Sequence, residues 1–201
     1  MSAVMINDGS PSPYDQLFQE DLDNRILVLN DVIDDTIIDT CMLYILKWNR
    51  EDKDIPKKKR QPIRLYLNSI GGDAFPAGQF CSLIEASETP IIGVAFDLVA
   101  SAAYHIYIAC HERIAFKNSV FLQHEGEIEA ADSISKFRNL VAFYDTMEER
   151  FRQNVLDHTA MTEEYYNSVY TTELWIYADE ARELGIVDKI IGEDCKLDEI
   201  I

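Results

Sequence analysis

The stretch "IRLYLNSIGG", Ile63 to Gly72, joins a short apolar run to a pair of glycines. An apolar run of this length that ends in turn residues is typical of a buried strand. A helix pattern begins directly afterwards, at Asp73. One glycine supplies a positive φ angle for the turn, and two in a row also let peptide N–H groups approach another group closely. The stretch therefore predicts a strand, a tight turn with bare amides, and a helix.

Four more short apolar runs predict further buried strands. They are Arg25–Leu29, Ile91–Phe96, Val120–Gln123 and Ile186–Ile191. Amphipathic helix patterns lie between several of the strands, at residues 34–48, where Ile38 and Cys41 share the apolar face, and at residues 73–87. Alternating strands and helices imply crossover connections, so the sequence predicts an α/β fold with a largely parallel sheet.

Length and charge limit the classes of protein to consider. With 201 residues, 47% of them hydrophobic, the chain is long enough for one well-packed domain and short for two. A formal net charge of -18 argues against binding to nucleic acid or to an anionic membrane, since phosphates attract the opposite sign. The apolar segment Ile91–Cys110 is about as long as a membrane span, but Asp97 and His105 make that placement costly. A buried strand followed by a helix is the prediction for it.

Cysteine spacing and the N-terminal sequence indicate a cellular compartment. The chain contains four cysteines, Cys41, Cys81, Cys110 and Cys195. They show no C-x-x-C spacing, so neither a zinc site nor a disulfide framework is predicted. The segment "MSAVMINDGSPSPYD" lacks the basic and apolar regions of a secretory signal, and we expect a cytoplasmic protein. The basic run Lys57–Arg60 is expected in an exposed loop, either as a solvated segment or as a docking signal.

A long segment without glycine or proline, from Ala131 to Thr159, is rich in charged residues and carries spaced apolar side chains such as Phe137 and Phe151. It predicts one long helix. A helix longer than the core of its own domain has apolar surface to spare, and such surface is commonly buried against another subunit.

Reactive groups are expected at one edge of the predicted sheet. Ser101 lies among alanines at a predicted helix start, where the N–H of Ala102 is free to donate. Alone, such a serine is more typical of an N-cap, and a lone histidine such as His124 is more often structural. However, Gly71, Gly72, Ser101 and His124 all follow predicted strands, and reactive groups collect at the carboxyl ends of parallel strands. Their coincidence favours a catalytic site.

At these residues the chain resembles the Clp peptidase family, ClpP. The motifs "LNSIGGD", "ASAA", "NSVFLQH" and "ADEARELGIVDKI" resemble four elements of that family, in the family's order. The resemblance runs from about Tyr14 almost to the C-terminus. It implies a ClpP/crotonase-like fold, a repeated β-β-α superhelix with a handle made of a protruding strand and a long helix. It also implies a partly flexible N-terminal segment, residues 1–24, and a single peptidase domain, residues 25–201, with the handle at about 125–159.

The resemblance also implies the chemistry. Ser101 would be the nucleophile and His124 its general base, and the N–H groups of Gly72 and Ala102 would form the oxyanion hole. The third member of the triad would be Glu173, which stands where the family usually has aspartate.

Asp179 and Asp188 are weaker candidates for the triad acid. Gly71, Glu125 and Gly126 would contact the backbone of an extended substrate, in the manner of β-strand addition.

Family members form two stacked seven-membered rings that enclose the active sites. The implied partners are further copies of the chain, an AAA+ unfoldase that threads substrates, and unfolded polypeptides, with no cofactor and no metal. Ile70, Asp97 and the Glu125–Gly126 pair depart from the family pattern and mark a divergent member. Two alternatives stay open: a catalytically weak structural subunit of a mixed ring, suggested by Glu173 and the altered turns, and a crotonase-like acyl-CoA enzyme.

Overall fold

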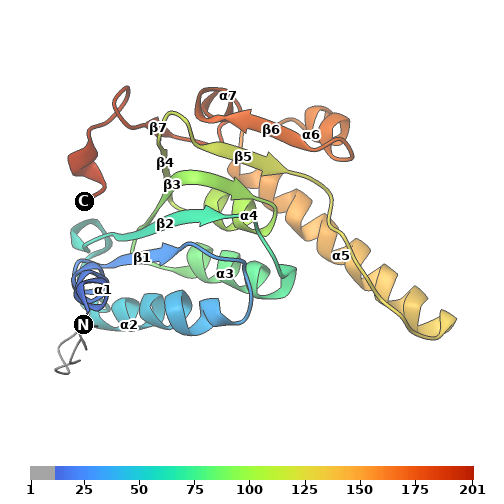
Figure 1. Ribbon diagram of the computed structural model, residues 1–201, viewed down its shortest axis with the longest axis horizontal. Coiled ribbons are helices and arrows are strands. Elements are labelled where there is room, and N and C mark those ends of the chain that lie inside the picture. Colours follow the sequence, from blue (N-terminus) through green and yellow to red (C-terminus); the bar gives the residue numbers. More distant parts are fainter. Residues whose placement is uncertain (1–11) are drawn as a thin grey trace, which may run out of the picture.

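The computed structural model describes residues 12–201; residues 1–11, which include part of the predicted flexible N-terminal segment, lie outside the described residues. Five parallel strands form the main sheet, in the order β1-β2-β3-β4-β7 (Figure 1). These strands are β1 Ile26–Leu29, β2 Ile63–Ser69, β3 Ile91–Ala100, β4 Glu112–Ala115 and β7 Lys189–Ile190. Two further strands, β5 Val120–Gln123 and β6 Leu174–Tyr177, branch from the second half of β3.

The helices lie on the faces and at one end of this sheet (Figure 1). They are α1 Pro13–Asp23, α2 Leu43–Glu51, α3 Ala74–Ala86, α4 Ala102–Ile108, α5 Ile134–His158, α6 Glu163–Val169 and α7 Ala178–Glu183. Three short turns complete the described elements: the π-helix η1 Ile38–Met42, and the 3-10 turns η2 Lys57–Lys59 and η3 Leu197–Glu199. Figure 1 shows α5 extending away from the body of the molecule, with the segment that follows β5 running beside it. No helix within residues 12–201 combines the length and apolar character needed to cross a membrane.

A bulge in β3 brings the site together. Leu67 of β2 pairs with Ala95, whereas Ser69 pairs with Val99, so β3 carries extra residues around Asp97. A bulge bends a strand and increases its twist. Before the bulge β3 pairs with β4, and after it β3 pairs with β5. The bend therefore carries the end of β3 to the strand that His124 follows.

The core fixes α4 on the sheet. Every residue of α4 is buried, and Tyr104 and Tyr107 are among the largest fully buried side chains. The Tyr107 ring lies 5.2 Å from that of Phe121, and its hydroxyl donates to the carbonyl oxygen of Ile114 at 3.0 Å. Because burying each large apolar side chain stabilises the fold by about 1.5–3 kcal/mol, the start of α4 is rigidly held.

The described elements differ from the sequence predictions in several places. The helix expected at residues 34–48 begins with a π-turn, which shifts the buried face, so Cys41, Ile45 and Trp48 are buried while Ile38 is 42% exposed. The short strands β4 and β6 were not predicted. The protruding strand expected after His124 is absent, since residues 124–133 have no assigned strand and pair with no strand of the same chain.

Candidate active site

Ser101 occupies a strained turn between β3 and α4. Its φ and ψ angles are 54° and -124°, a conformation that side-chain-bearing residues rarely adopt. The turn is held because the Ser101 N–H donates to the carbonyl oxygen of Leu122 at 2.9 Å and its own carbonyl accepts from Tyr104 at 3.0 Å. Ser101 stands at the N-cap position of α4, but its side chain makes no capping hydrogen bond. Strain of this kind collects at functional sites, and a sharp strand-to-helix turn is typical of an exposed nucleophile.

The glycine pair packs directly against this turn. A Cβ atom on Gly71, whose φ is +95°, would lie 2.7 Å from the Cβ of Ser101 and 2.8 Å from the carbonyl oxygen of Ala100. A Cβ atom on Gly72, whose φ is +150°, would lie 2.3 Å from the carbonyl oxygen of Ile33. Both positions therefore require glycine.

The same glycines leave an amide free. Ile33 donates to the carbonyl oxygen of Gly71 and accepts from the N–H of Asp73, both at 2.8 Å. The N–H of Gly72 lies between these two bonds and has no hydrogen-bond partner among the described residues, and the same is true of the N–H of Ala102. Two unpartnered N–H groups beside a serine are the arrangement that an oxyanion hole requires.

His124 faces the same space. It directly follows β5, is half-buried, and lines a cavity of about 280 Å³ together with Gly72, Ser101 and Ala102. Among residues 12–201, neither the Ser101 hydroxyl nor the His124 ring has a hydrogen-bond partner, so the serine–histidine bond is not formed. Catalytic hydrogen bonds are often long in unliganded enzymes and shorten when substrate binds.

The backbone of Glu173 lies beside that of His124, but the two side chains do not form a hydrogen bond. Gln123 pairs with Leu174 in the antiparallel β5–β6 ladder, which places residue 173 opposite residue 124. Glu173 has a positive φ of 51°, and its carboxylate accepts a hydrogen bond from the indole N–H of Trp175 at 3.0 Å. The structure shows no bond between this carboxylate and the imidazole.

The two weaker candidates for the acid lie elsewhere. Asp188 forms an ion pair with Arg113 at 2.7 Å and also accepts from the Arg113 backbone N–H. Asp179 is exposed in the first turn of α7. Neither hydrogen-bonds to His124.

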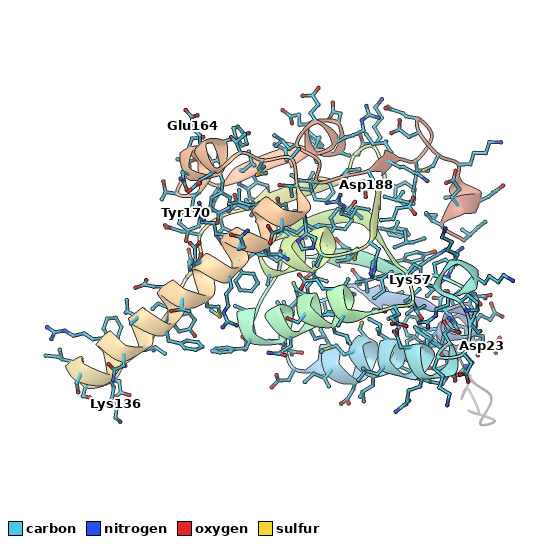
Figure 2. The ribbon with its side chains drawn as sticks, turned by 180° about the vertical axis from the view of Figure 1, so that it is seen from behind. Asp23, Lys57, Lys136, Glu164, Tyr170 and Asp188 are labelled. Carbon is cyan, nitrogen blue, oxygen red and sulfur yellow. The ribbon has the colours of Figure 1, made fainter. Side chains whose placement is uncertain are left out.

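The segment after His124 is fixed by a residue of α5. Glu148 accepts a hydrogen bond from the N–H of Gly126 at 3.1 Å and another from the hydroxyl of Tyr170 at 2.6 Å. Figure 2 shows Tyr170 against α5. Glu125 is exposed. The Gly126 N–H predicted to pair with substrate is thus occupied by a side chain of the same chain.

His105 and Glu148 are among the cavity residues that were not predicted from the sequence as parts of the site. His105 lies one helical turn after Ser101, and its buried ring packs 4.4 Å from the ring of Phe151. Burial lowers the pKa of His105 to about 4, so the ring is neutral at pH 7. The four-residue spacing from Ser101 on one helix is a signal that could have identified it. Glu148 carries no such signal. Within residues 12–201, no group of three or more metal-binding side chains is close enough to hold a metal ion.

The chain is similar to known proteins over most of its length. A family model described as Clp protease matches residues 12–194. The ATP-dependent Clp protease proteolytic subunit 1 of Frankia casuarinae is 26% identical over 191 residues, which cover 92% of this chain and 85% of that protein. The ATP-dependent Clp protease proteolytic subunit 2 of Corynebacterium glutamicum is 23% identical over 189 residues, with coverages of 93% and 91%.

A solved structure of a ClpP1 mutant from Listeria monocytogenes has the same fold, with a TM-score of 0.74 and 21% identity over 87% of this chain and 95% of that chain. The predicted fold class is therefore confirmed. Low identity throughout agrees with a divergent member. Since the family model spans most of the sequence, the chain belongs to the Clp protease family.

Proposed function

We propose that the chain is a serine endopeptidase subunit that cleaves unfolded polypeptides. The observation that carries this proposal is the strained Ser101 turn, with two unpartnered amides and an imidazole lining the same cavity. Ser101 would attack the peptide carbonyl, and His124 would take its proton and pass it to the leaving amine. The N–H groups of Gly72 and Ala102 would stabilise the negative oxygen of the intermediate, each by about 3 kcal/mol.

The proposal extends to the assembly. We infer a cytoplasmic homo-oligomer of two stacked seven-membered rings that receives substrates from an AAA+ unfoldase. The protruding α5 supports an oligomer because it exposes Ile134, Phe137 and Phe143, and exposed apolar clusters are commonly buried against partners. The family match favours this peptidase over the acyl-CoA enzyme.

A fluorophosphonate probe tests the nucleophile directly. The assembled protein is expected to gain one covalent adduct, located at Ser101 by mass spectrometry. Ser101→Ala should abolish the adduct, whereas Ser168→Ala, at an exposed serine of α6, should leave it unchanged. An assembled, folded protein that gains no adduct would contradict the proposal.

The second candidate is a catalytically weak structural subunit of a mixed ring. It is favoured by one observation: Glu173 is bonded to Trp175 and does not orient His124. Glu173→Gln distinguishes the two. In an active peptidase it should lower kcat by about 10²–10⁴-fold, because an imidazole without its orienting carboxylate is a poor base. Asp179→Asn is the matched control. Equal, near-zero peptide hydrolysis in all three proteins would favour the structural subunit.

A further inference from the structure

The cavity beside Ser101 is acidic. Three carboxylates line it, those of Asp73, Glu127 and Glu148, and its lining contains neither lysine nor arginine. Ser101, Gly72 and Ala102 line the same space, so a side chain next to an attacked carbonyl can enter it. We call it the Ser101 cavity.

Glu148 provides a negative charge without a counter-ion in the described part of the chain. Its two oxygens accept from neutral donors, the N–H of Gly126 and the hydroxyl of Tyr170, and it forms no ion pair. A carboxylate has about four acceptor sites, so roughly two remain for a ligand. Arg152 does not neutralise it, because the Arg152 guanidinium is already paired with Glu149 and Glu163.

His105 provides a second, independent indication of a polar ligand. It lines the cavity and is only 8% exposed, and its Nδ1 atom is buried without a hydrogen-bond partner. The Asn154 side chain lies close enough to the ring to raise the pKa of His105 against the larger lowering by burial, but its Oδ1 atom and the His105 Nδ1 atom are both outside hydrogen-bonding geometry. Since the ring is neutral at pH 7, it does not repel a cation, and one of its two nitrogens is an acceptor.

Aromatic rings form the walls. Phe75, Tyr144, Phe151 and Tyr166 line the cavity, and Phe75 meets Tyr144 edge-on with ring centroids 6.2 Å apart. Such rings contact the alkyl stem of a long side chain and stack on the plane of a guanidinium group. An acidic side chain would be repelled by Glu148, and an aliphatic one would leave the acceptors of Glu148 and His105 unpaired.

We propose that the Ser101 cavity selects arginine, as the substrate residue on the acyl side of the cleaved bond. Guanidinium offers several donors in a fixed plane, to the Glu148 carboxylate and the His105 ring, and its stem lies along the aromatic walls. The inference that this arginine precedes the cleaved bond rests on the proposed function. The binding of its side chain in the cavity does not.

A binding experiment on the assembled Ser101→Ala protein tests it. Fluorescein-labelled peptides carry arginine, citrulline, leucine or glutamate at one position. Citrulline has nearly the shape of arginine and no charge. The arginine peptide should bind at least about 10-fold more tightly than the citrulline peptide, because a site built for polar partners rejects ligands that lack them.

Matched variants locate the selectivity. Adding Glu148→Gln should reduce the preference for arginine over citrulline to about twofold or less, and His105→Phe should reduce it in part. Glu164→Gln makes the same charge change on exposed α6 (Figure 2) and should preserve the preference. Equal binding of the arginine and citrulline peptides, or equal effects of Glu148→Gln and Glu164→Gln, would overturn the proposal.

Cleavage by the protein with Ser101 intact separates this inference from the proposed function. Mass spectrometry of fragments from an unfolded substrate should show cuts after arginine. Arginine-selective binding without any cleavage would overturn the peptidase and support the cavity's selectivity. Cleavage mainly after leucine would support the peptidase and overturn the selectivity.

Discussion

The conformation of Ser101 depends on the absence of a side chain at Gly71. Both residues have positive φ angles, and the space between them is too small for one more carbon atom. Gly71→Ala should therefore destabilise the fold by about 1–3 kcal/mol and displace the nucleophile. The urea midpoint should fall, and the rate of fluorophosphonate labelling should fall more steeply.

Gly192→Ala is the matched control for this prediction. Gly192 also has a positive φ, +88°, but a Cβ atom there would meet nothing within 4 Å. It shares the cost of the backbone conformation without the steric clash. If both variants lowered the labelling rate equally, close packing at Gly71 would not be what positions Ser101.

The buried His105 makes stability depend on pH. Burial lowers its pKa from 6.5 to about 4, and the neighbouring His124 acts in the same direction. Between these pH values the unfolded chain binds a proton that the folded chain does not, so stability falls as the pH falls from about 6.5 towards 4. His105→Phe removes this contribution, which reaches about 3 kcal/mol near pH 4.

Urea unfolding at several pH values checks the His105 prediction. The free energy of unfolding of the wild-type protein should decrease more steeply between pH 6.5 and 4 than that of His105→Phe. The pKa of His111 is also lowered by burial, but this contribution is present in both proteins and cancels in their difference. Parallel curves would mean that the pKa of His105 is not lowered in the folded protein.

At the scale of elements, local patterns predicted most of the sheet. The strand Val120–Gln123 matches its prediction in full, and the helix predicted at residues 73–87 begins and ends within one residue of α3. The strand β4 was missed because its four residues, ERIA, do not form an apolar run, and β6 was missed although its four residues, LWIY, are all apolar or aromatic. The bulge at Asp97 was also missed, since it depends on how β3 exchanges β4 for β5.

In the candidate site, too, some residues could be predicted from local patterns and others could not. The placement of Gly72, Ser101 and His124 around one cavity could be predicted because each follows a predicted strand, and parallel strands end at the same edge. The part played by Glu148 could not be predicted. It belongs to α5, and its contacts with Gly126 and Tyr170 exist only after distant segments pack together.

The bond between Tyr170 and Glu148 should restrain the segment that follows β5. Tyr170→Phe removes the hydroxyl that donates to Glu148 at 2.6 Å, which leaves the carboxylate free to move away from Gly126. Because a hydrogen bond to a charged group contributes about 1.5–3 kcal/mol, amide exchange in residues 125–133 should accelerate about 10-fold or more.

Hydrogen–deuterium exchange measured by mass spectrometry checks this restraint. Tyr165→Phe is the control, since Tyr165 is exposed and its hydroxyl makes no hydrogen bond with the described residues. Exchange of residues 125–133 should be unchanged in Tyr165→Phe, and exchange of α3 should be unchanged in both variants. Unchanged exchange of residues 125–133 in Tyr170→Phe would show that Glu148 does not depend on Tyr170 for its position.

At the scale of the whole molecule, charge and apolar surface oppose each other. Each chain carries a formal net charge of -18, so copies repel one another. The exposed Ile134 and Phe137 of α5 favour association because their burial removes apolar surface from water. Association should therefore strengthen as salt rises from about 0.01 M to 0.1 M, as the screening length falls from about 30 Å to 10 Å.

Sedimentation velocity tests this balance. The mean mass in solution should rise with salt, and the double variant Ile134→Asp, Phe137→Asp should shift to smaller species at every salt concentration. Leu197→Asp is the control, because Leu197 is also exposed, at 51%, but lies in η3, far along the chain from α5. A mass that falls as salt is added would mean that ion pairs between copies, rather than the apolar surface of α5, hold the assembly together, since salt weakens ion pairs and not apolar contacts.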